Sequence, residues 1–544
     1  MSQERHESSS GRMEILLWIV YLALLCVAAV GNLNRFNHDA VAYLQLADHW
    51  AHGRWSLAVS GYWSPLLSWL AVPWRLCSID PFVVGRLLMV GSGVLWLAGM
   101  LRLVNVLNLS IGMRRAIVFL SALMGIGASV EHVTPDLLVA GILMFLMRAV
   151  VEDDFMTCRK RPIQVGCLIG LGFLAKAIAL PWGLGLLFLS WVLRPEARRR
   201  LRAWFAWRPL LVSTLVVGAF AGPWIAVLSI QYNKLTVSTT GAIAHSLYSA
   251  DGRSRPHPYG VTLGLPSEGR VTSWEDPSEM DYPYWSPFES AEGFQRQMRL
   301  VIKNAITTGQ LLRRYDPFCL SIVGMMVLSW VVWQRLRKGD PWATHTTLVG
   351  GVLWLMGLYI WVYLDARELR YYYPIFVGLM AIAGQGVERL CVFMVGESKR
   401  RMISMLVTIA LILSFGLGVS ARAIMGLRGS DDPAVLVAKD MEARCRRAEV
   451  VGIFGGSGLL RGKRSGLFLA WLLEKPWAGD RALARPAEFA KAGVTIAVLN
   501  RQSGSAAAFE ASGEWENLDG RLFEVQEDPR QYPIQLFRYV VPNL

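Results

Sequence analysis

The chain alternates between apolar runs long enough to cross a lipid bilayer and shorter polar stretches. About eleven apolar runs occur, near residues 13–31, 81–105, 116–131, 136–151, 163–176, 178–193, 209–230, 317–333, 345–363, 373–395 and 402–424. Several have fewer than about 20 residues, so we expect tilted, broken or half-spanning helices among them. The stretch 163–193 could form one long helix, but Lys176 and Pro181 in its middle favour two short helices joined by a turn. The pattern predicts a polytopic α-helical membrane protein.

Two long segments between these runs do not have a membrane-spanning pattern. Residues 32–80 start polar and continue with Ala40, Leu44 and Ala47 on one helical face, followed by several tryptophans. Such a segment is typical of helices that lie along the membrane surface. Residues 231–314 are rich in Gly, Pro, Ser and Tyr and predict a long, partly ordered loop. Loops of this length in compact proteins usually have a function.

The C-terminal part, residues 428–544, has the composition of a small soluble domain. Its pattern predicts helices at 435–447 and 459–473 and buried strands at 449–454 and 494–499. This alternation indicates a compact α/β domain. We therefore divide the chain into a transmembrane domain, 1–427, and a C-terminal α/β domain.

Composition and charge support this interpretation. Of the 544 residues, 53% are hydrophobic and only 18% are charged, and 22 are tryptophans, which membrane proteins use at their two interfaces. The formal net charge is +14, but the basic residues form short clusters near 114–115, 159–161, 194–202, 335–338 and 399–401. These clusters fall in alternate loops, as cytoplasmic loops facing anionic lipid do, so we expect the bilayer and not nucleic acid as the partner. The seven cysteines lack CxxC spacing and indicate neither a zinc site nor a disulfide framework.

The same charge pattern gives an orientation. With the basic clusters in the cytoplasm, residues 32–80, 231–314 and the C-terminal domain all lie outside. We expect a multi-pass protein of the cell inner (plasma) membrane. Its active site, like its C-terminal domain, would then be extracytoplasmic.

Two of the predicted external turns are acidic. The first contains His38 and Asp39, with Tyr43 one turn later; Asp39 is either the N-cap of the surface helix or a functional carboxylate. The second contains Glu131, His132 and Asp136, where Asp136 could again be a helix cap.

Together these two turns could supply oxygen and nitrogen ligands to a divalent metal, although no spacing identifies a metal site. The metal ligands therefore stay unknown, and no cofactor is certain.

A third group is basic and comprises Lys176, Arg367 and Arg370, beside Tyr371. Basic side chains at helix ends can simply extend into the interface. Short external loops, however, usually avoid basic residues, so their presence also fits binding of an anion such as phosphate.

In order and spacing these pieces resemble the glycosyltransferase C superfamily. The closest branch holds protein O-mannosyltransferases and lipid A aminoarabinose transferases, the bacterial family 39-type membrane glycosyltransferases. The matching pieces are HDAVAYLQLADHWAHGRW, GYWSPLLSWL, TPDLLVAGILMFL, GLGFLAKAIALPW and RELRYYYPIFVGLMAIAG, within residues 13–395. The chain departs from the family in having Asp39–Ala40 where Asp-Glu is common, and in having no lysine within 61–70. The lipid A substrate is therefore not assigned.

The resemblance implies a glycosyltransferase that uses a polyprenyl-phosphate sugar. A sugar would pass from this donor to an acceptor glycan, lipid or protein outside the cell. Asp39 would be the general base, and Asp136 would orient the acceptor or a metal. Phosphate binding would fall to the basic group Lys176, Arg367 and Arg370 together with Tyr371. Two alternatives stay open: a transporter or flippase, and a non-catalytic glycan-binding scaffold of the same fold.

Overall fold

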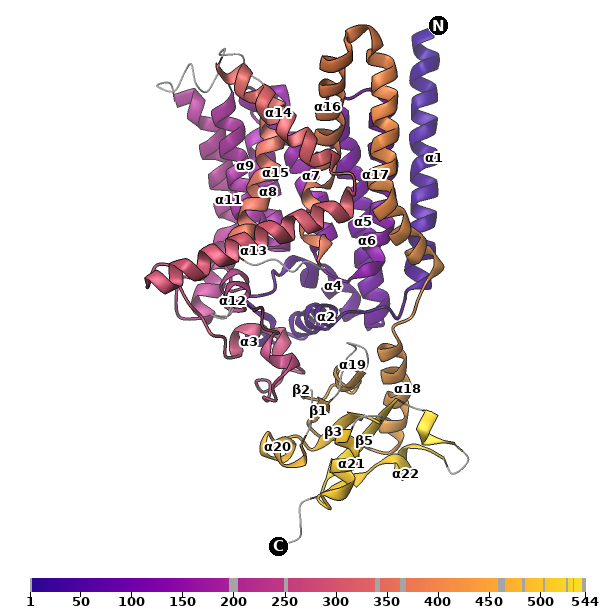
Figure 1. The fold of residues 1–544 in the computed structure, drawn as a ribbon. Helices are drawn as coiled ribbons and strands as arrows, with labels where there is room; N and C mark the ends of the chain where they lie inside the picture. Colours follow the sequence, from indigo (N-terminus) through magenta and orange to yellow (C-terminus); the bar gives the residue numbers. More distant parts are fainter. Residues whose placement is uncertain are drawn as a thin grey trace.

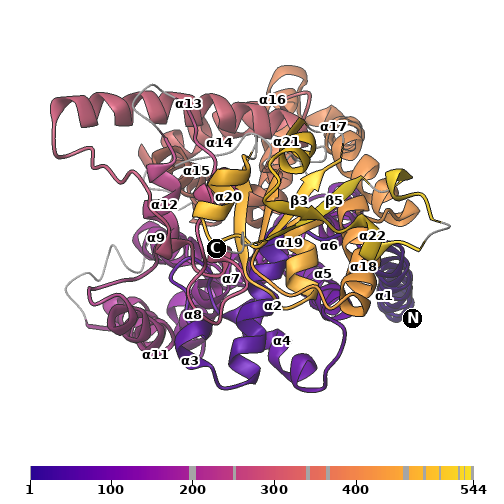
Figure 2. The same ribbon diagram turned by 90° about the horizontal axis from the view of Figure 1, so that it is seen from below.

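The computed structural model describes residues 2–194, 204–248, 253–337, 343–362, 368–457, 465–481, 485–501, 504–524, 527–531 and 533–540, and their side chains except those at 2–12, 153, 204–206, 336–337, 343–345 and 457. The chain folds into a bundle of long helices with a small C-terminal sheet domain at one end (Figure 1). Seen from that end, the sheet domain lies across the bundle (Figure 2).

A helix corresponds to each of the expected apolar runs. In the described residues these are α1 (Ser2–Gly31), α5 (Pro81–Val106), α6 (Ile111–Glu131), α7 (Asp136–Val151), α8 (Arg161–Ala175), α9 (Ala179–Leu193), α11 (Trp204–Gln231), α14 (Leu320–Arg337), α15 (Ala343–Trp361), α16 (Phe376–Val395) and α17 (Arg400–Arg428). By length and composition alone, 6 helices of the described chain could cross a membrane, or up to 7 if the bent pair α13–α14 is one span. Helices α8, α9 and the described part of α15 are apolar but shorter.

The predicted break within 163–193 is present. Helix α8 ends at Ala175, Lys176 has an extended backbone with φ −157°, and α9 begins at Ala179. The break leaves Lys176 at the end of a helix, where its side chain can turn toward α7.

Close helix packing holds α7 against α5. A Cβ on Gly99 would lie 2.7 Å from the carbonyl oxygen of Gly141, and a Cβ on Gly141 would lie 2.9 Å from the backbone nitrogen of Trp96. Small residues at such crossings let two helix backbones approach, and van der Waals packing then stabilises the pair in lipid. This contact fixes the helix that carries Asp136.

The segment 32–80 folds into α2 (His38–Ala51), α3 (Trp55–Ala58) and α4 (Leu66–Leu76) at the end of the bundle that faces the sheet domain (Figure 1). We expected α2 to lie along the membrane surface with its polar face exposed to water, but residues 39–47 are all buried. The difference arises because the connection between α11 and α13 and the C-terminal helix α19 cover the face that sequence alone assigns to solvent.

The segment 231–314 is more ordered than the sequence indicates. It contains α12 (Thr240–Ser246) and the 3-10 turns η2 (Pro258–Gly260), η3 (Ser273–Glu275) and η4 (Pro277–Glu279), and it ends in a long helix, α13 (Ala291–Tyr315). The prediction of a loop up to residue 314 was therefore wrong. The buried face of α13 mixes leucines with polar side chains: Gln297 Nε2 donates to Trp361 O at 2.7 Å and Asn304 Nδ2 donates to Ile360 O at 3.0 Å. Hydropathy cannot detect a helix that buries hydrogen-bonding groups.

Two short 3-10 turns, η1 (Asp153–Met156) and η6 (Glu397–Lys399), lie in connections of the bundle, and η5 (Leu369–Ile375) leads into α16. The α16–α17 connection lies at the end of the bundle opposite the sheet domain (Figure 1). The three segments expected outside therefore share one end of the molecule.

The C-terminal part is a mixed α/β unit. It contains α18 (Pro433–Arg447), α19 (Ser465–Leu472), α20 (Pro486–Lys491), α21 (Gly504–Ala511), α22 (Asp519–Leu522), η7 (Pro529–Gln531) and the strands β1 (Phe454–Ser457), β2 (Trp477–Arg481), β3 (Ile496–Asn500), β4 (Trp515–Asn517) and β5 (Ile534–Tyr539). The strand order is β2-β1-β3-β5-β4, with β1 parallel to β2 and β3, and β5 antiparallel to β3 and β4.

The first strand of this sheet begins later than expected. The prediction placed a strand at 449–454, whereas β1 starts at Phe454. Glu449 has a left-handed backbone with φ 50°, and the N–H of Val450 donates to Cys445 O at 2.9 Å, so these residues close the end of α18.

Candidate active site

Asp39 lies in the first turn of α2 and is not its cap. The N-cap is Asn37, whose side chain makes no capping bond and instead accepts the N–H of Val133 at 3.0 Å. That bond joins the start of α2 to the turn that precedes α7. The helix-cap interpretation of Asp39 was wrong, and its carboxylate is directed to other partners. Asp136 likewise is not the N-cap of α7: it is the first residue of the helix, and Pro135 occupies the cap position without a side-chain capping bond.

The predicted acids and bases meet at the end of the bundle. Arg370 lies 3.1 Å from Asp39 Oδ2 and 3.8 Å from Asp136 Oδ2 through one guanidinium nitrogen. Its Nε lies 2.8 Å from Glu368, and the ammonium of Lys176 pairs with Asp136. Four elements, α2, α7, the end of α8 and η5, supply these groups. Residues 331 positions apart in the chain are therefore in direct contact.

The cluster is only partly open to solvent. The side chains of Asp39 and Asp136 are 9% and 5% exposed, whereas those of Arg370 and Lys176 are 15% and 23% exposed. The cations are thus easier to reach from outside than the carboxylates. An incoming anion would meet them first.

Electrostatics keeps Asp39 ionised. Burial alone would raise the pKa of Asp39, but the Arg370 guanidinium, with His38 and His132, outweighs it and holds that pKa well below its usual range. Burial and the Arg370 charge both lower the pKa of His132, against the opposite effect of Glu131 and the other nearby carboxylates.

Two tyrosines line the cluster. The Tyr371 ring lies under Lys176, 5.0 Å from its Nζ, and 6.0 Å from the Arg370 guanidinium. Tyr43 is buried against Trp63, and burial, with Asp136 and Asp39 nearby, raises the pKa of its hydroxyl. Tyr43 therefore lines the site as a neutral side chain and does not act as an acid or base near pH 7.

The accessory residues divide between two places. His38 Nε2 lies 3.7 Å from Asp39 Oδ1, so His38 belongs to the cluster. Glu131 turns the other way: it pairs with Arg422 at 2.9 Å and accepts the Tyr373 hydroxyl at 3.3 Å. His132 lies within electrostatic reach of both groups.

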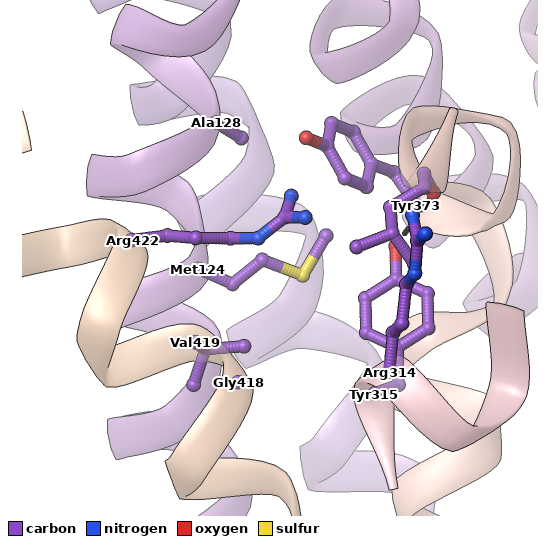
Figure 3. Close-up of a pocket in the computed structure, with 9 residues that line it drawn as sticks. Met124, Ala128, Arg314, Tyr315, Tyr373, Gly418, Val419 and Arg422 are labelled. Carbon is purple, nitrogen blue, oxygen red and sulfur yellow. Dashed lines mark hydrogen bonds between the residues drawn. The ribbon is translucent and has the colours of Figure 1, made fainter. Parts of the chain in front are cut away.

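Arg422 and Tyr373, the partners of Glu131, line a small cavity of about 20 Å³ between α6, α13, α17 and η5 (Figure 3). Figure 3 shows the Arg422 guanidinium pointing toward Tyr373 across this space, with Arg314 on the far side. Leu369 lines the cavity, and the next residue, Arg370, faces the carboxylates on the other side of η5. The cavity is therefore adjacent to the cluster and not part of it.

Arg367 lies outside the described residues. Within the part of the chain that the structure describes, no group of three or more His, Cys, Asp or Glu side chains could hold a metal ion. The two buried carboxylates, Asp39 and Asp136, are already neutralised by Arg370 and Lys176. These residues therefore do not fit a divalent metal.

Two site residues were not predicted. Trp274 Nε1 donates to Asp39 Oδ1 at 3.2 Å, and Glu368 is a third carboxylate on Arg370, beside Asp39 and Asp136. The sequence marked the segment around Trp274 as functional by its length, but nothing in it singles out one tryptophan. Glu368 is adjacent to predicted residues and could have been included on charge alone.

The fold is similar to solved structures of two kinds. ArnT from Cupriavidus metallidurans bound to undecaprenyl phosphate matches with a TM-score of 0.51 at 13% identity, over 97% of this chain and 98% of that chain. The same protein in the apo state matches with a TM-score of 0.53 at 12% identity, over the same shares of both chains. An Archaeoglobus fulgidus oligosaccharyltransferase in complex with Zn and sulfate matches with a TM-score of 0.51 at 12% identity, over 88% of this chain and 68% of that chain. No family model and no curated protein sequence matches the chain.

At such low identity these matches show the fold alone. They confirm the predicted fold, a multi-pass helical bundle with a C-terminal domain, which this chain shares with ArnT. The match to ArnT extends over nearly the whole chain and so includes the C-terminal sheet domain.

Proposed function

We propose that this protein is a membrane glycosyltransferase that moves a sugar from a polyprenyl-phosphate donor to an acceptor on the extracytoplasmic face. The observation that carries the proposal is the contact of Asp39 and Asp136 with Arg370 and Lys176 at one end of a glycosyltransferase C-type bundle. A carboxylate beside two accessible cations supplies a base and a phosphate-binding group within one small site.

Lys176 and Arg370 are the groups that would hold the donor phosphate. A guanidinium can bind a phosphate through two parallel hydrogen bonds, and an ammonium adds a compact charge. Tyr371, under both cations, keeps them over one face of the site. Arg367, by its place in the sequence, would be a third cation. The undecaprenyl phosphate bound to ArnT is a ligand of this chemical class.

Asp39 would take the proton of the acceptor. Without a bound donor, Asp39 forms an ion pair with Arg370, which lowers its pKa and makes it a weak base. A phosphate that binds Arg370 would compensate that positive charge and raise the pKa of Asp39 toward a range useful for catalysis. The acceptor oxygen or nitrogen would then bond to the anomeric carbon while Asp39 accepts its proton. The bond from that carbon to the phosphate oxygen breaks, and the polyprenyl phosphate leaves with the electron pair.

A polyprenyl phosphate is a good leaving group, so the reaction needs no strong general acid. This distinguishes the site from glycoside hydrolases, which use two cooperating carboxylates. The ion pairs of Asp136 with Lys176 and Arg370 support a role in positioning the two cations. A single displacement at the anomeric carbon inverts its configuration.

The orientation supports an extracytoplasmic site. The basic cluster 399–401 follows the connection at the end of the bundle opposite the sheet domain. The positive-inside rule assigns that end to the cytoplasm and the site to the other side of the cell inner (plasma) membrane. We also propose the division into a transmembrane part, 1–427, and an extracytoplasmic domain, 428–544.

The proposal is tested with purified protein in lipid vesicles and an extract of polyprenyl-phosphate sugars. Wild-type protein should release free polyprenyl phosphate, whereas Arg370→Gln should bind the donor roughly ten- to hundredfold more weakly, as expected for a lost charge-assisted contact. Arg313→Gln changes an exposed arginine of α13 and is the matched control. If the donor crosses the bilayer without being consumed, the protein is a flippase and the proposal is wrong.

A further inference from the structure

Trp274 reaches the carboxylate of Asp39 from the connection between α11 and α13. Its indole N–H donates to Oδ1 at 3.2 Å, while Arg370 holds Oδ2 at 3.1 Å. The indole is only 3% exposed and stacks on Tyr259 with ring centroids 4.3 Å apart. The orientation of the carboxylate therefore depends on this connection as much as on the helix bundle.

Buried hydrogen bonds fix the segment that carries Trp274. Glu275 Oε1 accepts the N–H of Val271 at 2.7 Å, and its Oε2 lies 2.8 Å from His49 Nε2 on α2. Both of these side chains are almost fully buried, at 0% and 1% exposure. Trp63 Nε1 donates to the carbonyl oxygen of Trp274 at 2.7 Å. These bonds hold the segment in place, so that Trp274 covers the carboxylate of Asp39.

The C-terminal sheet holds the same segment from the other side. Strand β2 is the edge strand of the sheet, and its open edge pairs with the connection. The N–H of Trp477 donates to Val271 O at 2.6 Å, and the N–H of Gly264 donates to Ala478 O at 2.7 Å. These bonds occupy an edge that would otherwise be left unpaired.

The sheet domain also contacts the chain just before Asp39. Trp471 of α19 stacks on Phe36 with centroids 6.4 Å apart and 24° between the ring planes. Phe36 precedes Asp39 by three residues, and Val271 precedes Trp274 by three residues. The sheet domain thus contacts the chain three residues before each partner of the Asp39–Trp274 hydrogen bond.

We propose that the C-terminal sheet domain positions the catalytic carboxylate, by holding Phe36 and Val271 so that the Trp274 indole N–H stays on Asp39. Trp274 is then a positioning residue for the reaction. The C-terminal domain is required for turnover although it supplies no reacting group. This inference rests on the proposed function of Asp39 as the base.

The first test is Trp274→Phe, which removes the N–H and keeps an aromatic ring. We expect kcat to fall roughly tenfold or more, as for loss of a hydrogen bond to a charged group, with KM within about twofold. The acidic limb of the kcat profile should move to higher pH, because the lost N–H stabilised the ionised carboxylate. A purely structural role of Trp274 would not move that limb.

The matched control is Trp285→Phe in the same connection. Trp285 Nε1 donates to His245 O at 3.3 Å, away from Asp39, so this change should leave kcat and its pH profile unaltered. If Trp274→Phe lowers the melting temperature, the measurement is repeated with benzothienylalanine at position 274, which keeps the indole shape without the N–H. Normal kcat with an unshifted limb in either protein would overturn the role of Trp274.

The second test addresses the sheet domain directly. Gly264→Pro removes the N–H that donates to Ala478 O, whereas Gly264→Ala keeps it and places a methyl group in open space. We expect faster hydrogen exchange at residues 262–276 and a lower kcat for the proline variant only. Equal turnover and equal exchange in both variants would overturn the positioning role of the domain.

Asp39→Asn, measured in parallel, separates this inference from the proposed function. An inactive Asp39→Asn together with a fully active Trp274→Phe rejects only the positioning role. An active Asp39→Asn rejects Asp39 as the base, and with it the positioning of a catalytic carboxylate, while the transfer reaction itself would still be observed.

Discussion

At the scale of single residues, the two carboxylates and two cations of the site were predictable, but their pairing was not. Asp39, Asp136, Lys176 and Arg370 are noticeable in the sequence because ionisable groups are expensive near a membrane. Their mutual contacts depend on helix packing between residues hundreds of positions apart. Trp274 was missed for the same reason: its hydrogen bond to Asp39 spans 235 residues, and tryptophans are common in this chain.

Asp39→Asn should lower transfer roughly 10² to 10⁴-fold, the usual worth of general-base catalysis, because an amide cannot accept the acceptor's proton. The structure also predicts a modest loss of stability, since Asp39 is an ion-pair partner and not a cap. Arg370 keeps Asp136 and Glu368 as counter-charges, so it is not left unpaired. Transfer and thermal unfolding are measured on the same purified sample. Near-normal transfer by a folded Asn variant would instead direct attention to Asp136 and Glu131.

The pH dependence of the reaction should change when the donor binds. In the free site, burial would raise the pKa of Asp39, but Arg370 holds it below its usual range. A bound phosphate compensates Arg370, so the acidic limb of kcat should lie on the order of 1 pH unit above that of kcat/KM. The sign follows because kcat reports the donor-bound enzyme and kcat/KM reports the free enzyme. Full profiles of both parameters check this, and coincident limbs would contradict it.

At the scale of elements, a helix lies at each apolar run that hydropathy identified. Hydropathy missed a helix where polar side chains are buried, in α13. The sequence predicts a loop where α13 lies, because polar side chains occupy part of its buried face. Gln297 and Asn304 bury amides that hydrogen-bond to backbone carbonyl groups at the end of α15. The sequence predicts that α2 lies along the membrane surface, because periodicity does not record that η3 and α19 cover its other face. A strand as short as β1 has too few residues for the hydrophobic pattern to predict where it begins and ends.

The crossing of α5 and α7 gives a prediction at this scale. Gly99→Ala should destabilise the protein by on the order of 1–3 kcal/mol, because its methyl group would lie 2.7 Å from the Gly141 carbonyl oxygen and force the helices apart. Transfer should fall as well, since α7 carries Asp136. Gly91→Ala, in the same helix but with open space around its Cβ, is the control. Thermal unfolding in detergent compares the two, and equal melting temperatures would show that the crossing tolerates a methyl group.

At the scale of the whole molecule, the sequence predicted which segments would gather at one end, because the positive-inside rule acts on the entire chain. It could not predict that the sheet domain contacts the segment over the site, since the bonds from Trp477 to Val271 and from Gly264 to Ala478 are backbone contacts without side-chain specificity. The similarity to ArnT extends over 97% of this chain and so includes the sheet domain.

This arrangement makes the topology testable with single cysteines in a background in which the seven natural cysteines are replaced. Ser267→Cys in the connection over the site and Ala511→Cys in α21 should both react with an impermeant thiol reagent in intact cells, or in spheroplasts if an outer membrane intervenes. Ser398→Cys, between α16 and α17, should react only after permeabilisation; all three positions are exposed in the structure. The reverse pattern would invert the molecule and move the site into the cytoplasm. Labelling of Ser267→Cys without Ala511→Cys would place the membrane between two segments that contact each other through β2, and would contradict the fold itself.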